Sequence, residues 1–268
     1  MLIDLHVKTD RSPGIKGTIK DTLKRAKKAQ LDGVLFADVL ASSHCDEILQ
    51  EAKAQGVRAF IGVEIPTDKG VLVGVVPDVD TFYKQELWQS LTEYTTPTAE
   101  SVIALFHEHN GAVIAARPYD REVPYPMGDH LFALEGLHAV EVMTCSTTTF
   151  QDDFALEAAR NLGLCTVGGS DQEQGKNKVG KCATFFSKDV STQEELVEAL
   201  RSSEFWAIRL EKPGQPRDKS QDERRSRDSG DKRRSGGRSG SGGRSGGRGG
   251  SSGRSGGRGR SGGGRRRD

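Results

Sequence analysis

Short apolar runs alternate with amphipathic stretches along the first 210 residues. The runs predict strands, whereas apolar positions three or four residues apart predict helices. Predicted strands cover 2–6, 33–38, 57–64, 70–76, 111–116, 138–144 and 163–168, with a further one at 204–209. Predicted helices cover 18–30, 44–55, 81–94, 98–109, 148–162 and 192–201. This alternation predicts an α/β domain with a largely parallel sheet.

Five of the predicted strands end at, or just before, a polar residue of the kind found in active sites. These residues are His6, Asp38, Glu64, Arg117 and Asp171. A barrel and an open doubly wound sheet both fit the number of strands. In an α/β barrel the carboxyl ends of the strands form the active-site face. The strand-end residues therefore favour the barrel.

Composition changes sharply after residue 211. Residues 212–268 contain 18 Lys and Arg but 6 Asp and Glu, a net charge of +12. Residues 1–211 hold the remaining 21 basic and 32 acidic residues, a net charge of −11. No aromatic residue follows Trp206, and Gly, Ser and Arg dominate the end of the chain. We expect a folded domain at 1–211 and a disordered basic tail at 212–268, because the tail cannot form an apolar core.

Cysteine usage and the lack of long apolar segments suggest a cytoplasmic protein. The four cysteines, Cys45, Cys145, Cys165 and Cys182, form no CxxC pair and are expected to be reduced thiols. No long apolar stretch opens the chain, so no secretory signal is expected. No run approaches the roughly 20 apolar residues that a membrane span needs.

Motifs at the strand ends follow one another in a recognisable order. They are 4–9 (DLHVKT), 36–39 (FADV), 62–64 (GVE), 115–118 (AARP) and 169–173 (GSDQE). In order and spacing they resemble the DLHxHT, TDH, GxE, AHP and GSDxH motifs of the PHP family, the polymerase and histidinol phosphatase domains. The resemblance covers most of 1–185. It implies a distorted (β/α)7 barrel whose relatives often bind up to three metal ions and hydrolyse phosphoesters.

The resemblance also implies that this chain is a degenerate member of the family. Four family metal ligands survive as His6, Asp38, Glu64 and Asp171. Four family histidines are replaced by Lys8, Val39, Arg117 and Glu173. Catalytic residues are therefore not assigned, and the expected protein is an inactive homologue.

Lys8 and Arg117 change the chemistry expected at the strand ends. They carry positive charge and offer no lone pair to a metal ion. We hypothesise that they neutralise Asp38, Glu64 and Asp171 as an ion-pair cluster in place of the metal. Two alternatives stay open. The surviving ligands, with Glu173, could hold one divalent ion such as Mn, Zn or Mg, or Lys8 and Arg117 could bind a phosphate.

The tail resembles the RGG and RS segments of RNA-binding proteins. Guanidinium groups on a flexible backbone bind phosphates through counterion release. The predicted nucleic-acid-binding residues are Arg238, Arg244, Arg248, Arg254, Arg258, Arg260, Arg265, Arg266 and Arg267. We expect them to bind RNA or another polyanion. The alternatives are transient binding to the acidic domain, or an effect on solubility alone.

These features together predict a metal-depleted barrel that associates with RNA through its tail. A ligand-poor PHP-like barrel also occurs as a protein subunit of ribonuclease P, which is a precedent by analogy alone. The alternatives are a metal-dependent phosphoesterase or nuclease with a reduced metal site, and a protein-interaction module whose acidic domain meets the partner. The RNA and the oligomeric state are not predicted.

Overall fold

The computed structural model of the chain describes residues 1–40, 44–93, 96–171 and 178–210. The predicted tail at 212–268 lies outside these residues. All predicted strands are present, and one more was not predicted, the strand at Cys182–Phe186. The strands of the described residues are β1 (Leu2–Val7), β2 (Gly33–Val39), β3 (Arg58–Thr67), β4 (Gly70–Val75), β5 (Ala112–Ala116), β6 (Ala139–Thr144), β7 (Cys165–Gly169), β8 (Cys182–Phe186) and β9 (Phe205–Arg209).

The helices also lie where the amphipathic stretches predict them. They are α1 (Ile19–Lys28), α2 (Cys45–Gln55), α3 (Val79–Tyr83), α4 (Glu86–Glu93), α5 (Ala99–Glu108), α6 (Thr149–Leu162) and α7 (Gln193–Ser202), with a short 3-10 helix, η1 (Gly128–Ala133). Threonine caps begin several of them. Thr148 and Thr192 both form capping boxes, in which the threonine hydroxyl accepts a bond from the backbone three residues later.

One predicted helix, 81–94, is two helices in the structure. The break between α3 and α4 brings Phe82, Tyr83 and Trp88 into one aromatic cluster. The ring of Trp88 lies 5.4 Å from that of Phe82 and 5.2 Å from that of Tyr83. Residues six positions apart on a continuous helix do not share a face. The break therefore allows all three rings to be buried together.

The sheet is less parallel than the alternation predicts. The strand order is β7-β6-β5-β4-β3-β2-β1-β8-β9. Strands β1 to β3 are mutually parallel, and so are β5 to β7, but β4 is antiparallel to both its neighbours, and β8 and β9 are antiparallel additions. Only two residues separate Thr67 from Gly70. That connection is too short for the crossover a parallel pair needs, so β4 returns as a hairpin.

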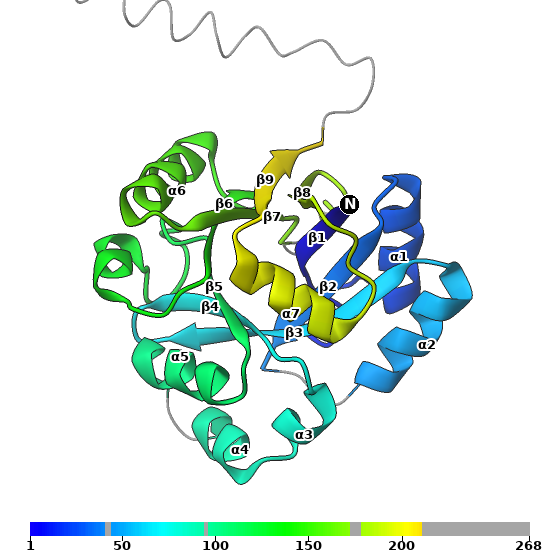
Figure 1. Cartoon of the computed structure of the whole chain (residues 1–268), viewed down its shortest axis with the longest axis horizontal. Coiled ribbons are helices and arrows are strands. Elements are labelled where there is room, and N and C mark those ends of the chain that lie inside the picture. Colours follow the sequence, from blue (N-terminus) through cyan, green and yellow to red (C-terminus); the bar gives the residue numbers. More distant parts are fainter. Residues whose placement is uncertain (41–43, 94–95, 172–177, 211–268) are drawn as a thin grey trace, which may run out of the picture. The chain divides into compact units, whose positions relative to one another are not determined.

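The sheet curls into a nearly closed barrel because β7 returns to β1 and β8 (Figure 1). The amide of Asp171 donates to the carbonyl of His6 at 2.7 Å. The Thr184 hydroxyl bridges β8 to β7 by accepting from the Gly168 amide and donating to its carbonyl. A side chain at Gly169 would collide with His6, whose backbone nitrogen lies 2.7 Å from the ideal Cβ position. Glycine at position 169 therefore permits the close approach of β7 to β1.

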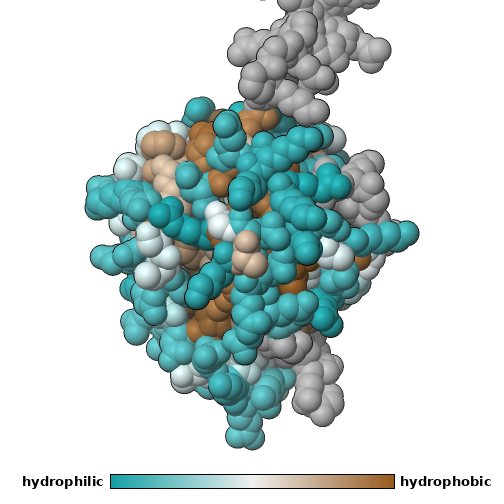
Figure 2. Space-filling view, turned by 90° about the vertical axis from the view of Figure 1, so that its right-hand side faces the viewer, coloured by the Kyte–Doolittle hydropathy of each residue, from teal (hydrophilic) through white to brown (hydrophobic). Residues whose placement is uncertain are grey.

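Both faces of the sheet are buried, which explains the continuous apolar runs. Residues such as Leu35, Phe60 and Ile114 form an inner core that α7 completes with Leu196 and Leu200. Alternate residues of the same strands pack in an outer core with residues of the helices. Figure 1 shows these helices around the sheet. Figure 2 shows mostly hydrophilic side chains over the outer face that it presents, with separate apolar patches between them. Among the described helices, none has the length and apolar character needed to cross a membrane.

Candidate functional site

Strand alternation directs a set of charged side chains into one end of the barrel. On β3, Phe60 belongs to the inner core, and Glu64 lies four residues further along the same face. On β6, Ala139 points inward and is followed two residues later by Glu141. These two acids therefore face each other across the barrel mouth, and both are buried.

A shift in the pairing of β1 with β2 brings a side chain of the first strand into the barrel mouth. Ile3 and Leu5 belong to the inner core, whereas Val7 packs in the outer one. The pairing of β1 with β2 shifts register between Asp4 and Val7. Such shifts redirect a side chain, and here His6 is the residue that points into the mouth.

Arg117 and Asp171 enter the mouth from just beyond β5 and β7. Each has a backbone φ of 35°, in the left-handed region that residues other than glycine rarely adopt. Such conformations cost free energy and persist where the surrounding contacts hold them. At Asp171 the amide bond to the His6 carbonyl is one such contact.

These residues form a cluster of six charged side chains, called the charge cluster here: His6, Lys8, Glu64, Arg117, Glu141 and Asp171. The Lys8 ammonium lies 2.8 Å from Glu64 and 2.6 Å from Asp171. Arg117 spans the same two acids, donating at 2.9 Å to Glu64 and at 2.7 Å to Asp171. Its backbone amide donates to Glu141 at 3.0 Å. Each of two buried carboxylates thus forms ion pairs with both cations.

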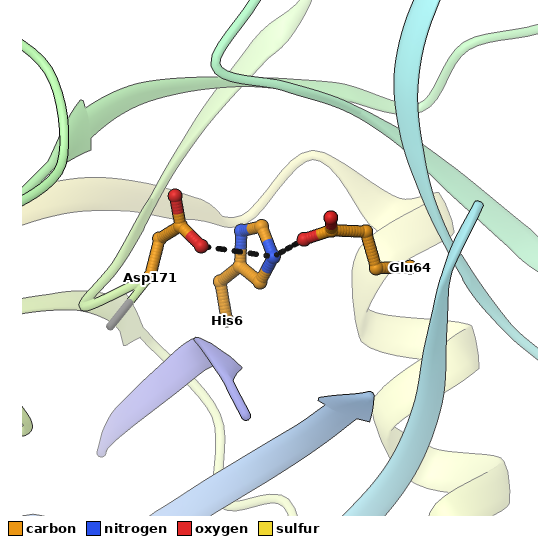
Figure 3. A group of neighbouring side chains, drawn as sticks. All are labelled: His6, Glu64 and Asp171. Carbon is orange, nitrogen blue, oxygen red and sulfur yellow. Dashed lines mark hydrogen bonds and ion pairs between the residues drawn. The ribbon is translucent and has the colours of Figure 1, made fainter. Parts of the chain in front are cut away.

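His6 lies between three carboxylates of the charge cluster. Nε2 is 2.6 Å from Glu64 and 3.6 Å from Asp171, and Figure 3 shows the ring between these two acids. Nδ1 is 3.1 Å from Glu141. Burial alone would lower the pKa of His6, but Glu141, Asp171 and Glu64 raise it to about 10. Both ring nitrogens face carboxylate oxygens, which accept, so both nitrogens donate and His6 is an imidazolium in this arrangement.

Lys8, Glu64 and Asp171 are also held in their charged forms by opposite charges. Burial opposes the charged forms, but the opposite charges outweigh it. The pKa of Lys8 is raised by Glu64 and Asp171. Arg117 and Lys8 hold the pKa of Glu64 well below its usual range, and His6, Arg117 and Lys8 lower that of Asp171. Among the described residues, Arg117 also pairs with Asp120 at 3.4 Å, so its charge is shared by three acids.

Asp38 does not belong to the charge cluster, which corrects the expectation that Lys8 and Arg117 neutralise it. Asp38 follows the inward-facing Ala37 and so leaves β2 on the other face. Its carboxylate accepts bonds from the Thr9 amide at 2.6 Å, the Thr9 hydroxyl at 2.8 Å, the Ser12 hydroxyl at 2.6 Å and His44 Nε2 at 3.0 Å. Burial would raise the pKa of Asp38, but these bonds lower it. Asp38 thus ties the loop after β1 to the start of α2.

The charge cluster does not fit a family-type metal centre. Within the described ranges, His6, Glu64 and Asp171 form one group that could hold an ion, with ligand atoms that all lie within 4.8 Å of one another. A metal needs a neutral imidazole nitrogen and free carboxylate oxygens at about 2.0–2.2 Å. Here His6 is protonated, and the Lys8 ammonium bridges the two carboxylates. An ion would have to displace Lys8 and remove a proton from His6.

Two further polar residues next to the charge cluster were not identified as site residues from the sequence. The Ser146 hydroxyl donates to Asp171 at 2.6 Å. Asp4, fully buried, accepts bonds from the Ser170 amide and hydroxyl; burial raises its pKa to about 6 despite these bonds. Asp4 could have been identified from the sequence, because it is the first residue of the motif at 4–9. No sequence motif points to Ser146.

Several predicted site residues cannot be placed. Glu173 and the nine tail arginines from Arg238 to Arg267 lie outside the described residues. Val39 lies at the end of β2 and supplies no ligand atom.

Known proteins share this fold at low sequence identity. A candidate metal-dependent phosphoesterase from Bifidobacterium adolescentis is 17% identical, with a TM-score of 0.55 over 74% of this chain and 95% of that one. PsfC from Pseudomonas syringae is 18% identical, with a TM-score of 0.55 over 77% and 90%. An amidohydrolase from Chromobacterium violaceum, solved with bound sulfate and no metal, is 15% identical, with a TM-score of 0.54 over 80% and 99%.

The sequence comparisons define the family more directly. No curated protein sequence matches the chain significantly. Residues 4–189, more than half of the chain, match the family model of the PHP domain. That range contains every member of the charge cluster. The chain therefore belongs to the PHP domain family.

Proposed function

We propose that this chain is a non-hydrolytic PHP protein in which internal cations replace the metal ions, and that it associates with RNA through its basic C-terminal region. One observation carries the first half of the proposal. Lys8 and Arg117 each contact both Glu64 and Asp171, at distances between 2.6 and 2.9 Å. The two acids that would bind an ion are already paired with two cationic side chains of the same domain.

Charge balance supports the same conclusion. A buried cation is stable only when anions compensate it, and the described carboxylates of the charge cluster already pair with Lys8, Arg117 and His6. A divalent ion could bind only if Lys8 moved away and His6 lost its proton, and both changes would break existing pairs. Arg117 cannot lose its proton to make room, because a guanidinium stays charged in proteins. The barrel mouth is therefore proposed to be a structural element of the domain.

Metal analysis tests this half of the proposal. The full chain is incubated with Mn²⁺ or Zn²⁺, gel-filtered and analysed for metal. We expect well below one ion per chain. The double variant Lys8→His with Arg117→His restores two family ligands and is expected to retain close to one ion and to be stabilised by it against heat. Lys24→His with Arg25→His, on the exposed face of α1, removes the same charges and should retain none.

The opposite result is equally clear. Unmodified protein that keeps one or more ions per chain, and hydrolyses a phosphomonoester in a manner abolished by Glu64→Gln, would show that the cations move aside. That is the second candidate function, a metal-dependent phosphoesterase with a reduced site. It is favoured by the proximity of His6, Glu64 and Asp171 and by the name of the Bifidobacterium adolescentis protein.

The RNA half of the proposal rests on composition. The region 212–268 has a net charge of +12 and repeated Arg-Gly and Arg-Ser steps. Flexible cationic chains bind single-stranded nucleic acids by counterion release, with an affinity that falls steeply with salt. The four free cysteines support a cytoplasmic location, where such a partner occurs.

RNA binding is tested on the full chain with two matched variants. In one, the nine predicted arginines are replaced by Gln, and in the other by Lys. Fluorescence anisotropy with a single-stranded RNA should show that the Gln variant loses most of its affinity and salt dependence, whereas the Lys variant retains both. Equal affinity of the Gln variant and the original protein would refute the role of the tail.

A further inference from the structure

Two cysteines from different parts of the chain meet beside the barrel mouth. Cys145 follows directly after β6, and Cys182 begins β8. Their sulfur atoms are 3.2 Å apart although 37 positions separate them in the sequence. Cys182 is fully buried, whereas Cys145 is partly exposed. One thiol is thus accessible to a reagent and the other lies behind it.

The two sulfurs lie close to bonding distance. A disulfide joins sulfurs about 2.05 Å apart, so closure requires an approach of about 1 Å. Cys182 lies within the sheet, and Cys145 directly follows the last residue of β6. β6 is paired with β7, and Cys182 is paired with Arg209 of β9. The pairing of these strands therefore brings the two cysteines together from distant parts of the sequence.

The surroundings make the exposed thiol the more reactive one. The hydrogen bond from Cys182 lowers the pKa of Cys145, and the positive charges of Arg209 and Lys178 act in the same direction. The Lys178 ammonium also donates to the Cys145 carbonyl. Burial and the neighbouring sulfur raise the pKa of Cys182 instead. The thiolate is the nucleophile in thiol chemistry, so attack begins at Cys145.

We propose that Cys145 and Cys182 form a redox-responsive dithiol, which small disulfides such as oxidised glutathione convert into an intramolecular disulfide across β6 and β8. This site is separate from the charge cluster and does not depend on the proposed function.

The reaction balances in two exchange steps. The Cys145 thiolate bonds to one sulfur of oxidised glutathione, and the first glutathione leaves as a thiolate that takes up the proton lost by Cys145. Cys182 then attacks the Cys145 sulfur, the bond to the second glutathione breaks, and that glutathione leaves with the Cys182 proton. The two cysteines lose two electrons, and oxidised glutathione gains them.

Formation of the Cys145–Cys182 disulfide would restrict the position of residues at the neighbouring barrel mouth. Ser146, next to Cys145, donates to Asp171 of the charge cluster at 2.6 Å. A disulfide would fix the end of β6 against β8 and with it the position of Ser146. It would also restrict a long loop in the unfolded chain, which stabilises the folded state.

The test uses the full chain in its reduced and glutathione-treated forms. Treatment is expected to remove the mass of two hydrogen atoms, and peptide mapping should find Cys145 joined to Cys182. The thermal midpoint should rise by on the order of 10 °C, and dithiothreitol should reverse both effects. Cys145→Ser should abolish the mass loss, whereas the matched variant Cys165→Ser should keep it.

Three results would overturn the proposal. Treated protein that stays folded by circular dichroism but loses no hydrogen would show that the thiols do not couple. A disulfide that involves Cys45 or Cys165 would show that other cysteines are preferred. A stable glutathione adduct at Cys145 would show that Cys182 cannot reach it. Because mapping is done on the unmodified chain, no result depends on a variant that fails to fold.

Discussion

Replacing Arg117 with Met tests whether the charge cluster holds the barrel together. The side chain is 9% exposed and bonds to Glu64 and Asp171, whose side chains are 4% and 3% exposed. Met keeps most of the volume but removes the charge. The two acids would keep Lys8 and His6 as partners, but one anion would be left uncompensated. Removing one partner of a buried ion pair costs about 3–5 kcal/mol.

That cost translates into a measurable shift of the thermal midpoint. For a domain of this size the midpoint should fall by about 6–20 °C. Calorimetry or circular dichroism at neutral pH measures it. The matched control is Arg58→Met, whose ion pair with Asp189 at 3.3 Å is exposed on both sides. Such surface pairs contribute about 0–1 kcal/mol, so the control should change the midpoint little.

A double variant separates lost charge from lost packing. Adding Glu64→Gln to Arg117→Met removes the orphaned anion and should restore part of the stability, because the two changes are coupled. The reasoning would be refuted if Arg117→Met shifted the midpoint no more than Arg58→Met, or if Glu64→Gln only added its own loss.

Two other predictions concern His6 of the charge cluster and Gly169, where β7 approaches β1. The pKa of His6 is raised to about 10, so the stability that its charge contributes is complete below its unfolded pKa of about 6.5 and is lost as pH rises towards 10. The free energies of unfolding of the original protein and of His6→Gln, measured with urea, should therefore converge between these two pH values. A difference that stays constant with pH would contradict the pairing. Gly169→Ala should lower the thermal midpoint by several degrees, because the new Cβ would lie 2.7 Å from the backbone nitrogen of His6. The control Ser146→Ala adds no atom and should cost no more than about 1–3 kcal/mol of stability for the lost hydrogen bond to Asp171. Equal midpoints for Gly169→Ala and the original protein would show that β1 and β7 can move apart to accept the methyl group.

Most of the secondary structure could be predicted from local pattern. Apolar runs buried on both faces located every strand but β8, and threonines placed helix starts because capping is a local interaction. The strand Cys182–Phe186 was not predicted, because it is a short run whose pairing partners are distant in the sequence. Leu2, for example, lies opposite Phe185. The direction of β4 could have been inferred, since the connection from Thr67 to Gly70 is too short for a crossover.

By itself, the sequence determined which chemical groups stand at the strand ends, including two cations where metal ligands would be expected. Only the tertiary structure decided their partners. Asp38 lies one position out of phase with the inward-facing Ala37, so it bonds to hydroxyls and His44, whereas Glu64 and Asp171 receive Lys8 and Arg117. The physical reason is that side-chain identity is local, but charge pairing depends on strand phase, register and closure of the barrel, which arise from contacts between distant segments.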